Sequence, residues 1–161
     1  MTLSQNKSAA LRLKFLTRVV RKECQHLIST DQRLFATPFT LERTQQLETD
    51  LELAERVEAF VGRFGRLQDT VGDKLLPLLL VALGETPAAA IDNLDKAERL
   101  GLLGSADEWI TMRQLRNQMV HEYVEDLTVL TSALQAGYDF VPILIAAVNK
   151  LTTEIDRRGW A

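Results

Sequence analysis

Apolar residues recur every three or four positions along almost the whole chain, and this helical period limits the fold more than any other feature. The first helix shows the pattern, because its lysines and arginines lie opposite a single apolar stripe. That stripe consists of Ala9, Leu13, Leu16, Val20, Cys24 and Leu27. No segment alternates apolar and polar residues as a half-buried strand does. The sequence therefore predicts an all-α, up-and-down bundle of about five to six helices with short connections.

Proline, glycine and capping residues divide this pattern into helices. Thr37-Pro38 ends the first helix, and the Thr40 hydroxyl can cap a second one. The apolar stripe of this second helix runs over residues 53–75, and Gly84 ends the segment. Thr86-Pro87 should start a short helix that Gly101 ends. Ser105 to Glu108 form a capping box before a helix over residues 109–123.

Glycines occur within two of the apolar stripes. Gly137 separates two expected final helices, over residues 126–136 and 138–157, and Pro142 is tolerated early in the second. Gly62, Gly65 and Gly72 lie within the second helix, where each costs roughly 1 kcal/mol relative to alanine. We therefore expect close helix packing or a bend at these three positions.

Length and composition favour one domain spanning residues 1–161. The longest unbroken apolar run covers nine residues, 75–83, whereas a membrane-spanning helix needs about 20, so neither a membrane span nor a secretory signal is expected. Cys24 is the only cysteine, which excludes an intramolecular disulfide, and its place in the apolar stripe predicts a core residue. The chain reads as cytoplasmic.

The charge distribution is uneven. The chain carries a net charge of −3, yet residues 1–30 hold six basic side chains against Glu23 alone, a local balance of 6 − 1 = +5. The net charge argues against coating a nucleic acid with the whole surface, but it permits a small cationic face on an acidic body.

Most catalytic motifs are missing. The sequence has no phosphate-binding P-loop, no dinucleotide fingerprint, no His-Glu-x-x-His and no EF-hand loop. Two histidines, His26 and His121, leave little for a metal site, and Asp69 and Asp73 are more often a solvated pair than a cation site. We therefore expect neither a metal nor a cofactor.

The segment 109–123 departs from the pattern because an arginine falls among its apolar residues. At about 100° per residue, Arg116 lies in the centre of an apolar face. The residues of this face are Trp109, Met112, Met119, Val120 and Tyr123. A buried arginine without a partner costs several kcal/mol. A polar wedge runs beside this face. It consists of Arg113, Asn117 and His121.

Three interpretations of Arg116 stay open at this point. The side chain can reach solvent or pair with a group of the second helix such as Gln68. The apolar seam can instead be a subunit interface that the arginine crosses. In the third interpretation Arg116 belongs to an anion site, because a guanidinium binds phosphate in a bidentate manner and His121 offers a proton near neutral pH.

Arginine and histidine are the minimum needed to cleave RNA without a metal. The 2′-hydroxyl must lose a proton, the leaving 5′-oxygen must gain one, and the charge on phosphorus needs a fixed cation. Arg116 and His121 lie about 140° apart on one helix, so two copies facing each other across a two-fold axis would make a better site. The seam of Trp109, Met112 and Met119 is the dimer interface that this arrangement predicts.

Residues 116–123 resemble the Arg-Asn-x-x-x-His-x-Tyr signature of HEPN domains, and most closely that of HepT-like toxins paired with minimal nucleotidyltransferases. Residues 63–69 and 92–97 are similar to family patterns on the preceding helices, and the resemblance covers roughly residues 10 to 157. It implies a helical-bundle ribonuclease toxin of a type VII-like toxin–antitoxin pair. The toxin would cleave RNA as a homodimer with the arginine and histidine of both copies in one cleft.

The resemblance also implies roles for single residues. Arg116 and His121 match the catalytic pair, Asn117 matches the polar neighbour, and Arg113 supports them as part of the wedge. Tyr123 matches a tyrosine to which the partner nucleotidyltransferase attaches AMP, which neutralises the toxin. An alternative is a non-catalytic helical subunit that presents a substrate to a nucleotidyltransferase. A second alternative is a plain dimeric interaction module in which Arg116 only fixes the register.

Overall fold

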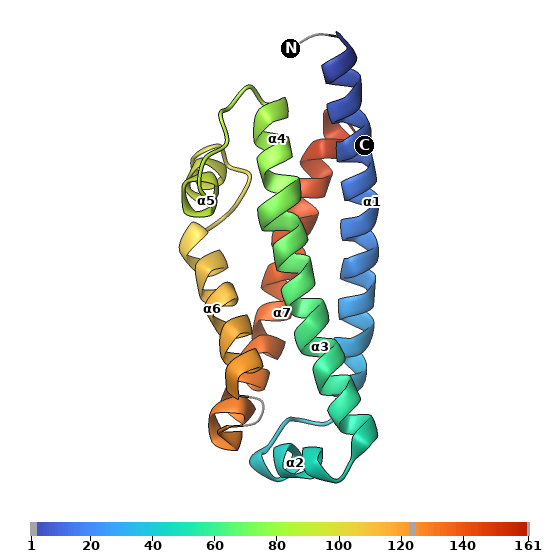
Figure 1. Ribbon diagram of the computed structural model, residues 1–161, viewed down its shortest axis with the longest axis vertical. Coiled ribbons are helices and arrows are strands. Elements are labelled where there is room, and N and C mark those ends of the chain that lie inside the picture. The colour runs from blue at the N-terminus through green and yellow to red at the C-terminus, as the bar shows by residue number, and fades with distance from the viewer. Residues whose placement is uncertain (1–2, 123–124, 161) are drawn as a thin grey trace.

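The computed structural model describes residues 3–122 and 125–160, with side chains from residue 7 to 121 and from 125 to 160. Its α-helices, in chain order, are α1 Leu3–Leu34, α2 Leu41–Gln45, α3 Leu51–Thr70, α4 Leu76–Ala82, α5 Ala90–Arg99, α6 Ala106–Glu122 and α7 Leu127–Arg157. The π-helical turn Val71–Leu75 joins α3 to α4 as one continuous rod, which leaves six helical rods (Figure 1). No strand occurs in the described ranges, so the predicted all-α fold is confirmed.

Four long rods run along the molecule in alternating directions (Figure 1). They are α1, the α3–α4 rod, α6 and α7, while α2 and α5 lie within the connections. Contacts between α1 and α3, α3 and α6, α6 and α7, and α7 and α1 close these rods into one bundle. The up-and-down arrangement follows from the short connections, which force consecutive helices to be antiparallel neighbours.

The core lies along the inner faces of these four rods. Its largest fully buried side chains include Phe60 and Phe64 of α3 and Trp109 of α6. The stripe predicted for the first helix is buried from Leu13 to Leu27, and Cys24 is a core residue as predicted. Burial, and next the nearby Glu23 carboxylate, raises the pKa of the Cys24 thiol to about 11.

Pro77 explains the π-helical turn between α3 and α4. A proline lacks an N–H, so the Asp73 carbonyl four residues earlier has no helical donor there. In the turn just before this proline, the Leu76 N–H donates to the Val71 carbonyl, five residues back rather than four, which widens the turn. The wider turn sets the position of Gly72 and Asp73, both of which face α6 contacts described below.

Gly137 does not separate two helices, so that prediction is wrong. One helix, α7, runs through it, and Gly137 is buried at the place where α7 crosses α3 and α6. A Cβ at this position would lie 3.2 Å from Phe60 Cε1 and 3.3 Å from Met119 Sδ. The glycine is therefore required by close packing inside a helix rather than by a turn.

The other helix boundaries are partly as predicted. Thr40 caps α2, where its hydroxyl accepts from the Arg43 N–H at 3.2 Å, and Gly84 and Gly101 end their helices with φ of +84° and +74°. The second helix, however, is interrupted, because Asp50 starts α3 anew by accepting from the Leu53 N–H at 3.0 Å.

The start of α5 also differs from the prediction. The helix begins at Ala90 rather than at Thr86-Pro87. The buried Asn93 side chain accepts from the Ala88 N–H at 2.8 Å and donates to the Ala88 carbonyl at 3.1 Å. This local pairing holds residues 86–89 in an extended entry to the helix.

Helix α7 is long and apolar enough to cross a membrane when only its length and composition are considered. The core helix of a soluble bundle passes the same test, and one face of α7 packs against α1, α3 and α6. Its buried side chains include Leu134, Leu144, Val148 and Leu151.

We predict opposite outcomes for the same substitution at two helical glycines. Gly137→Leu forces a large side chain against Phe60 and Met119 and should lower the free energy of unfolding by about 1–3 kcal/mol. Gly62→Leu enters open space on α3 and should leave it unchanged or raise it by up to about 1 kcal/mol. Urea denaturation measures both, and equal midpoints for the two variants would contradict the packing described here.

Candidate functional site

Helix α6 carries the motif residues, and its start is fixed as the sequence predicts. The Ser105 hydroxyl accepts from the Glu108 N–H at 3.1 Å. From there the helix buries one face against α3 and α7. The buried side chains of this face are Trp109, Met112, Leu115 and Met119.

The apolar seam of Trp109, Met112 and Met119 is not a dimer interface, so that prediction is wrong. Trp109, Met112 and Met119 are each at most 1% exposed within a single chain, so no second copy can bury them. The reason is that the neighbouring helices present glycines here. Trp109 Nε1 lies 3.4 Å from the position that a Cβ on Gly72 would take, and Met119 packs on Gly137.

Arg116 lies at the margin of the buried face rather than at its centre. The buried Leu115 shifts the centre of that face by roughly 45° away from Arg116. The arginine side chain crosses the surface of Gly65 on α3, where an added Cβ would come within 2.6 Å of its Nε. Its guanidinium reaches Asp69 at 3.3 Å, and the side chain stays 36% exposed. The guanidinium is thus both held in place and open to solvent.

Gln68 is not the partner of Arg116. Its amide is 2% exposed and donates to the Met112 carbonyl at 3.4 Å. Asp69, the next residue, takes the arginine instead. Arg116 therefore pairs with α3, as the first of the three interpretations predicts, but its partner is the Asp69 carboxylate.

A second ion pair lies about one turn along the same helix contact. Arg113 approaches Asp73 of the π-helical turn at 3.8 Å, and both side chains are more than one third exposed. Asp69 and Asp73 thus each face an arginine of α6, rather than forming a solvated pair of their own. Because both pairs are open to water, each contributes little to stability.

Asn117 and His121 lie on the exposed side of α6. Val120 lies there too, at 52% exposed, so its predicted place on the buried apolar face is wrong. Neither polar side chain has a hydrogen bond or ion pair within the described residues. Arg113, Asn117, Val120 and His121 follow an i, i+4, i+7, i+8 spacing and form one exposed stripe, which we call the α6 outer stripe.

The structure does not bring Arg116 and His121 together within one chain. Five residues separate them on α6, which is about 7.5 Å along the axis and about 140° around it. No hydrogen bond links the two described side chains. Tyr123, the predicted modification site, lies outside the described residues.

The cationic side chains predicted on the first helix are exposed. They are Lys7, Arg12, Lys14, Arg18, Arg21 and Lys22. Arg21, in the middle of α1, forms an ion pair with Asp156 near the C-terminal end of α7. No group of three or more His, Cys, Asp or Glu side chains gathers as a metal site in the part of the chain that the structure describes.

The close helix packing predicted at Gly65 is present, but sequence reasoning missed that Arg116 packs there and that Asp69 is its ion-pair partner. Gly65 and Asp69 are four positions apart and thus lie on one face of α3, so they present bare backbone and a carboxylate to α6. The matching spacings, Arg113 to Arg116 on one helix and Asp69 to Asp73 on the other, are the signal that could have indicated an antiparallel ion-pair ladder.

Comparisons of the chain with protein-family models, with curated proteins and with solved structures found no match.

We predict that Arg116→Ala lowers the free energy of unfolding by less than about 1 kcal/mol, because the ion pair with Asp69 is exposed on both sides. Arg113→Ala is the matched control from the second ion pair and should behave alike. Thermal or urea denaturation decides. A loss of several kcal/mol in Arg116→Ala alone would mean that the arginine serves the fold.

Proposed function

We propose that this protein is a metal-independent endoribonuclease, the toxin of a type VII-like toxin–antitoxin pair, with Arg116 and His121 as its catalytic residues. One observation carries the proposal: the Arg116 side chain packs on Gly65 yet is 36% exposed, on the same helix as an exposed His121. A phosphate can therefore reach both groups from solvent. Because the exposed ion pair with Asp69 adds little to the free energy of unfolding, stability is a weak reason for an arginine at this position. Binding an anion is the better reason.

The chemistry assigns one task to each side chain. His121 takes the proton of the RNA 2′-hydroxyl and returns one to the leaving 5′-oxygen, while Arg116 neutralises charge that develops on the phosphate. Asn117 and Arg113 support the site, with Asn117 as a neutral donor and Arg113 as a second cation. The products are a 2′,3′-cyclic phosphate and a free 5′-hydroxyl.

RNA must compete with Asp69 for the guanidinium. In the free protein the Asp69 carboxylate lies 3.3 Å from Arg116 and occupies the position that a phosphate oxygen would take. Because this pair is open to water, an incoming phosphate can replace the carboxylate at little cost. Asp69 thus keeps Arg116 oriented until RNA binds.

The site needs two copies of the chain, since Arg116 and His121 of one α6 point in different directions. The α6 outer stripe replaces the buried seam as the proposed interface. Val120 supplies apolar area there, and Asn117 and His121 border it. Around a two-fold axis, Arg116 of one copy then approaches His121 of the other.

The proposal predicts RNA cleavage that one histidine controls. Wild-type protein should cleave single-stranded RNA in the presence of EDTA, and His121→Ala or Arg116→Ala should reduce the rate at least a hundredfold. His26→Ala is the matched control, because it removes the other histidine, exposed on α1, and should retain activity. Gel analysis of end-labelled RNA measures the rate and identifies the cyclic phosphate.

Two results would contradict this prediction. Cleavage that EDTA abolishes and a divalent ion restores would refute the metal-free mechanism. RNA binding without cleavage, equal in wild type and His121→Ala, would select the alternative of a non-catalytic subunit that presents a substrate to a nucleotidyltransferase.

The second part of the proposal concerns control through Tyr123. A partner nucleotidyltransferase attaches AMP to this tyrosine, two residues after His121 in the sequence, and thereby silences the toxin. The adenylate adds bulk and a negative phosphate, which can satisfy the guanidinium that RNA would otherwise use.

Tyr123→Phe should therefore stay toxic when the partner enzyme is co-expressed, whereas wild type should be silenced. Tyr138→Phe is the matched control, because Tyr138 is the only other tyrosine and is 40% exposed on α7. Mass spectrometry of the peptide containing Tyr123 should show the mass of one or more AMP groups. An unmodified peptide in a fully silenced toxin would mean that the partner inhibits by binding alone.

A further inference from the structure

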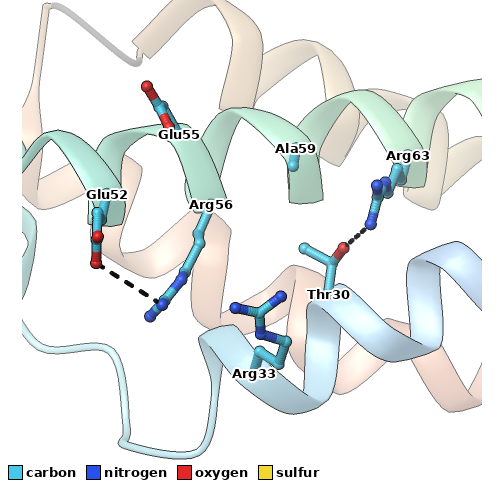
Figure 2. Close-up of a pocket in the computed structure, with 7 residues that line it drawn as sticks. All are labelled: Thr30, Arg33, Glu52, Glu55, Arg56, Ala59 and Arg63. Atoms are coloured by element: carbon cyan, nitrogen blue, oxygen red, sulfur yellow. Dashed lines mark hydrogen bonds and ion pairs between the residues drawn. The ribbon is translucent and has the colours of Figure 1, made fainter.

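A hollow of about 340 Å³ lies between the C-terminal half of α1 and the N-terminal half of α3, on the side of α3 that faces away from α6 (Figure 2). Its volume is at the lower end of the range for small-molecule sites. Three arginines line it, Arg33 from α1 and Arg56 and Arg63 from α3. Nothing in the proposed ribonuclease chemistry uses these residues.

The backbone geometry explains why the hollow exists. Arg56 and Arg63 are seven residues apart, so they project from the same face of α3 about 10.5 Å apart along its axis. Ala59 lies between them and its methyl group leaves the space open. Arg33 reaches into this space from the opposite helix (Figure 2).

The three guanidinium groups are only partly neutralised. Arg63 donates to the His26 carbonyl at 3.1 Å and to the Thr30 hydroxyl, both of them uncharged. Arg56 lies 4.0 Å from Glu52, whose side chain is 86% exposed, which makes this a weak pair. Arg33 has no hydrogen bond or ion pair among the described residues. The remaining carboxylate, Glu55, also lines the hollow, but it forms no ion pair with these arginines among the described residues (Figure 2). Three arginines of the lining thus face two carboxylates.

A fourth arginine adds to the positive charge. Arg43 donates to the Leu34 and Thr37 carbonyls, each at 2.6 Å, at the end of α1. Arg43 does not line the hollow, but burial lowers its pKa, and the charge of the neighbouring Arg56 lowers it further, while Asp50 acts in the opposite direction. Cations thus crowd this end of the α1–α3 contact, an arrangement that a bound anion would relieve.

We infer that this hollow, which we call the arginine hollow, binds a phosphate group through Arg33, Arg56 and Arg63. Planar guanidinium groups match the oxygens of phosphate in a bidentate manner, and three of them around one space suit an anion with more than one charge. The phosphate belongs either to a small phosphate compound or to a nucleic-acid backbone, which share this chemistry. The inference does not depend on the proposed ribonuclease activity.

Arg33 is the residue to change, because it has no partner that the fold would lose. Titration calorimetry of the full chain with pyrophosphate should show binding, and Arg33→Ala should weaken it at least tenfold. Arg18→Ala is the matched control, since Arg18 is an exposed arginine on the same helix about four turns earlier, and its loss changes the net charge equally. This control should bind pyrophosphate as wild type does.

A second arm identifies the source of the phosphate. An oligodeoxynucleotide has no 2′-hydroxyl, so the proposed reaction cannot cleave it and its binding is measured apart from catalysis. The oligonucleotide carries no terminal phosphate, so that only its backbone can bind, and fluorescence anisotropy measures the binding. If Arg33→Ala weakens only oligonucleotide binding, the ligand is a nucleic-acid backbone, and if it weakens pyrophosphate binding, the ligand is a small phosphate compound. The inference is overturned if neither probe binds, or if both bind equally to Arg33→Ala and Arg18→Ala.

Discussion

The close contact between α3 and α6 determines where the described candidate residues of α6 lie. It depends on two positions of the α3–α4 rod that have no side chain. The indole of Trp109 packs against Gly72, and the side chain of Arg116 packs along Gly65. Any larger residue at Gly65 would meet the arginine at 2.6 Å, so the glycine decides the path by which Arg116 reaches solvent. Asp69, one turn further, then fixes the direction of its guanidinium.

This contact separates two kinds of surface on α6. The side that faces α3 and α7 is filled by Trp109, Met112 and Met119, which belong to the core of one chain. The outer side carries Asn117, Val120 and His121 in the open. Arg116 lies at the boundary between the two, where it can be oriented by α3 and still be reached from outside. A dimer that forms through the outer stripe would leave the core untouched.

The sequence alone predicts the bundle well, because helical period and caps are local signals. The buried stripe of α1, the Thr40 and Ser105 caps and the glycine helix ends at Gly84 and Gly101 all follow from neighbouring residues. Gly137 shows the limit of such reasoning, since only the contact with Phe60 and Met119 explains a glycine inside a helix.

The candidate site was predictable as a set of residues but not as an arrangement. A helical wheel assigns Arg116 to the apolar face, yet whether it is buried depends on what α3 presents opposite, and Gly65 leaves it half exposed. The same reasoning assigned the Trp109 seam to a subunit interface, because an apolar face does not reveal whether its own chain or a second copy covers it. The arginine hollow joins residues from two helices, so no single segment of the sequence indicates it.

The central claim is that Arg116 and His121 act together across two copies of the chain. Mixing separately inactive Arg116→Ala and His121→Ala proteins, followed by an RNA cleavage assay, tests it most directly. Random pairing makes half of the dimers mixed, and each mixed dimer keeps one of the two Arg116–His121 pairs of the shared cleft intact. If each pair acts alone, activity should return to roughly a quarter of wild type. If native mass spectrometry shows mixed dimers and cleavage stays at the level of the separate variants, the shared site is refuted.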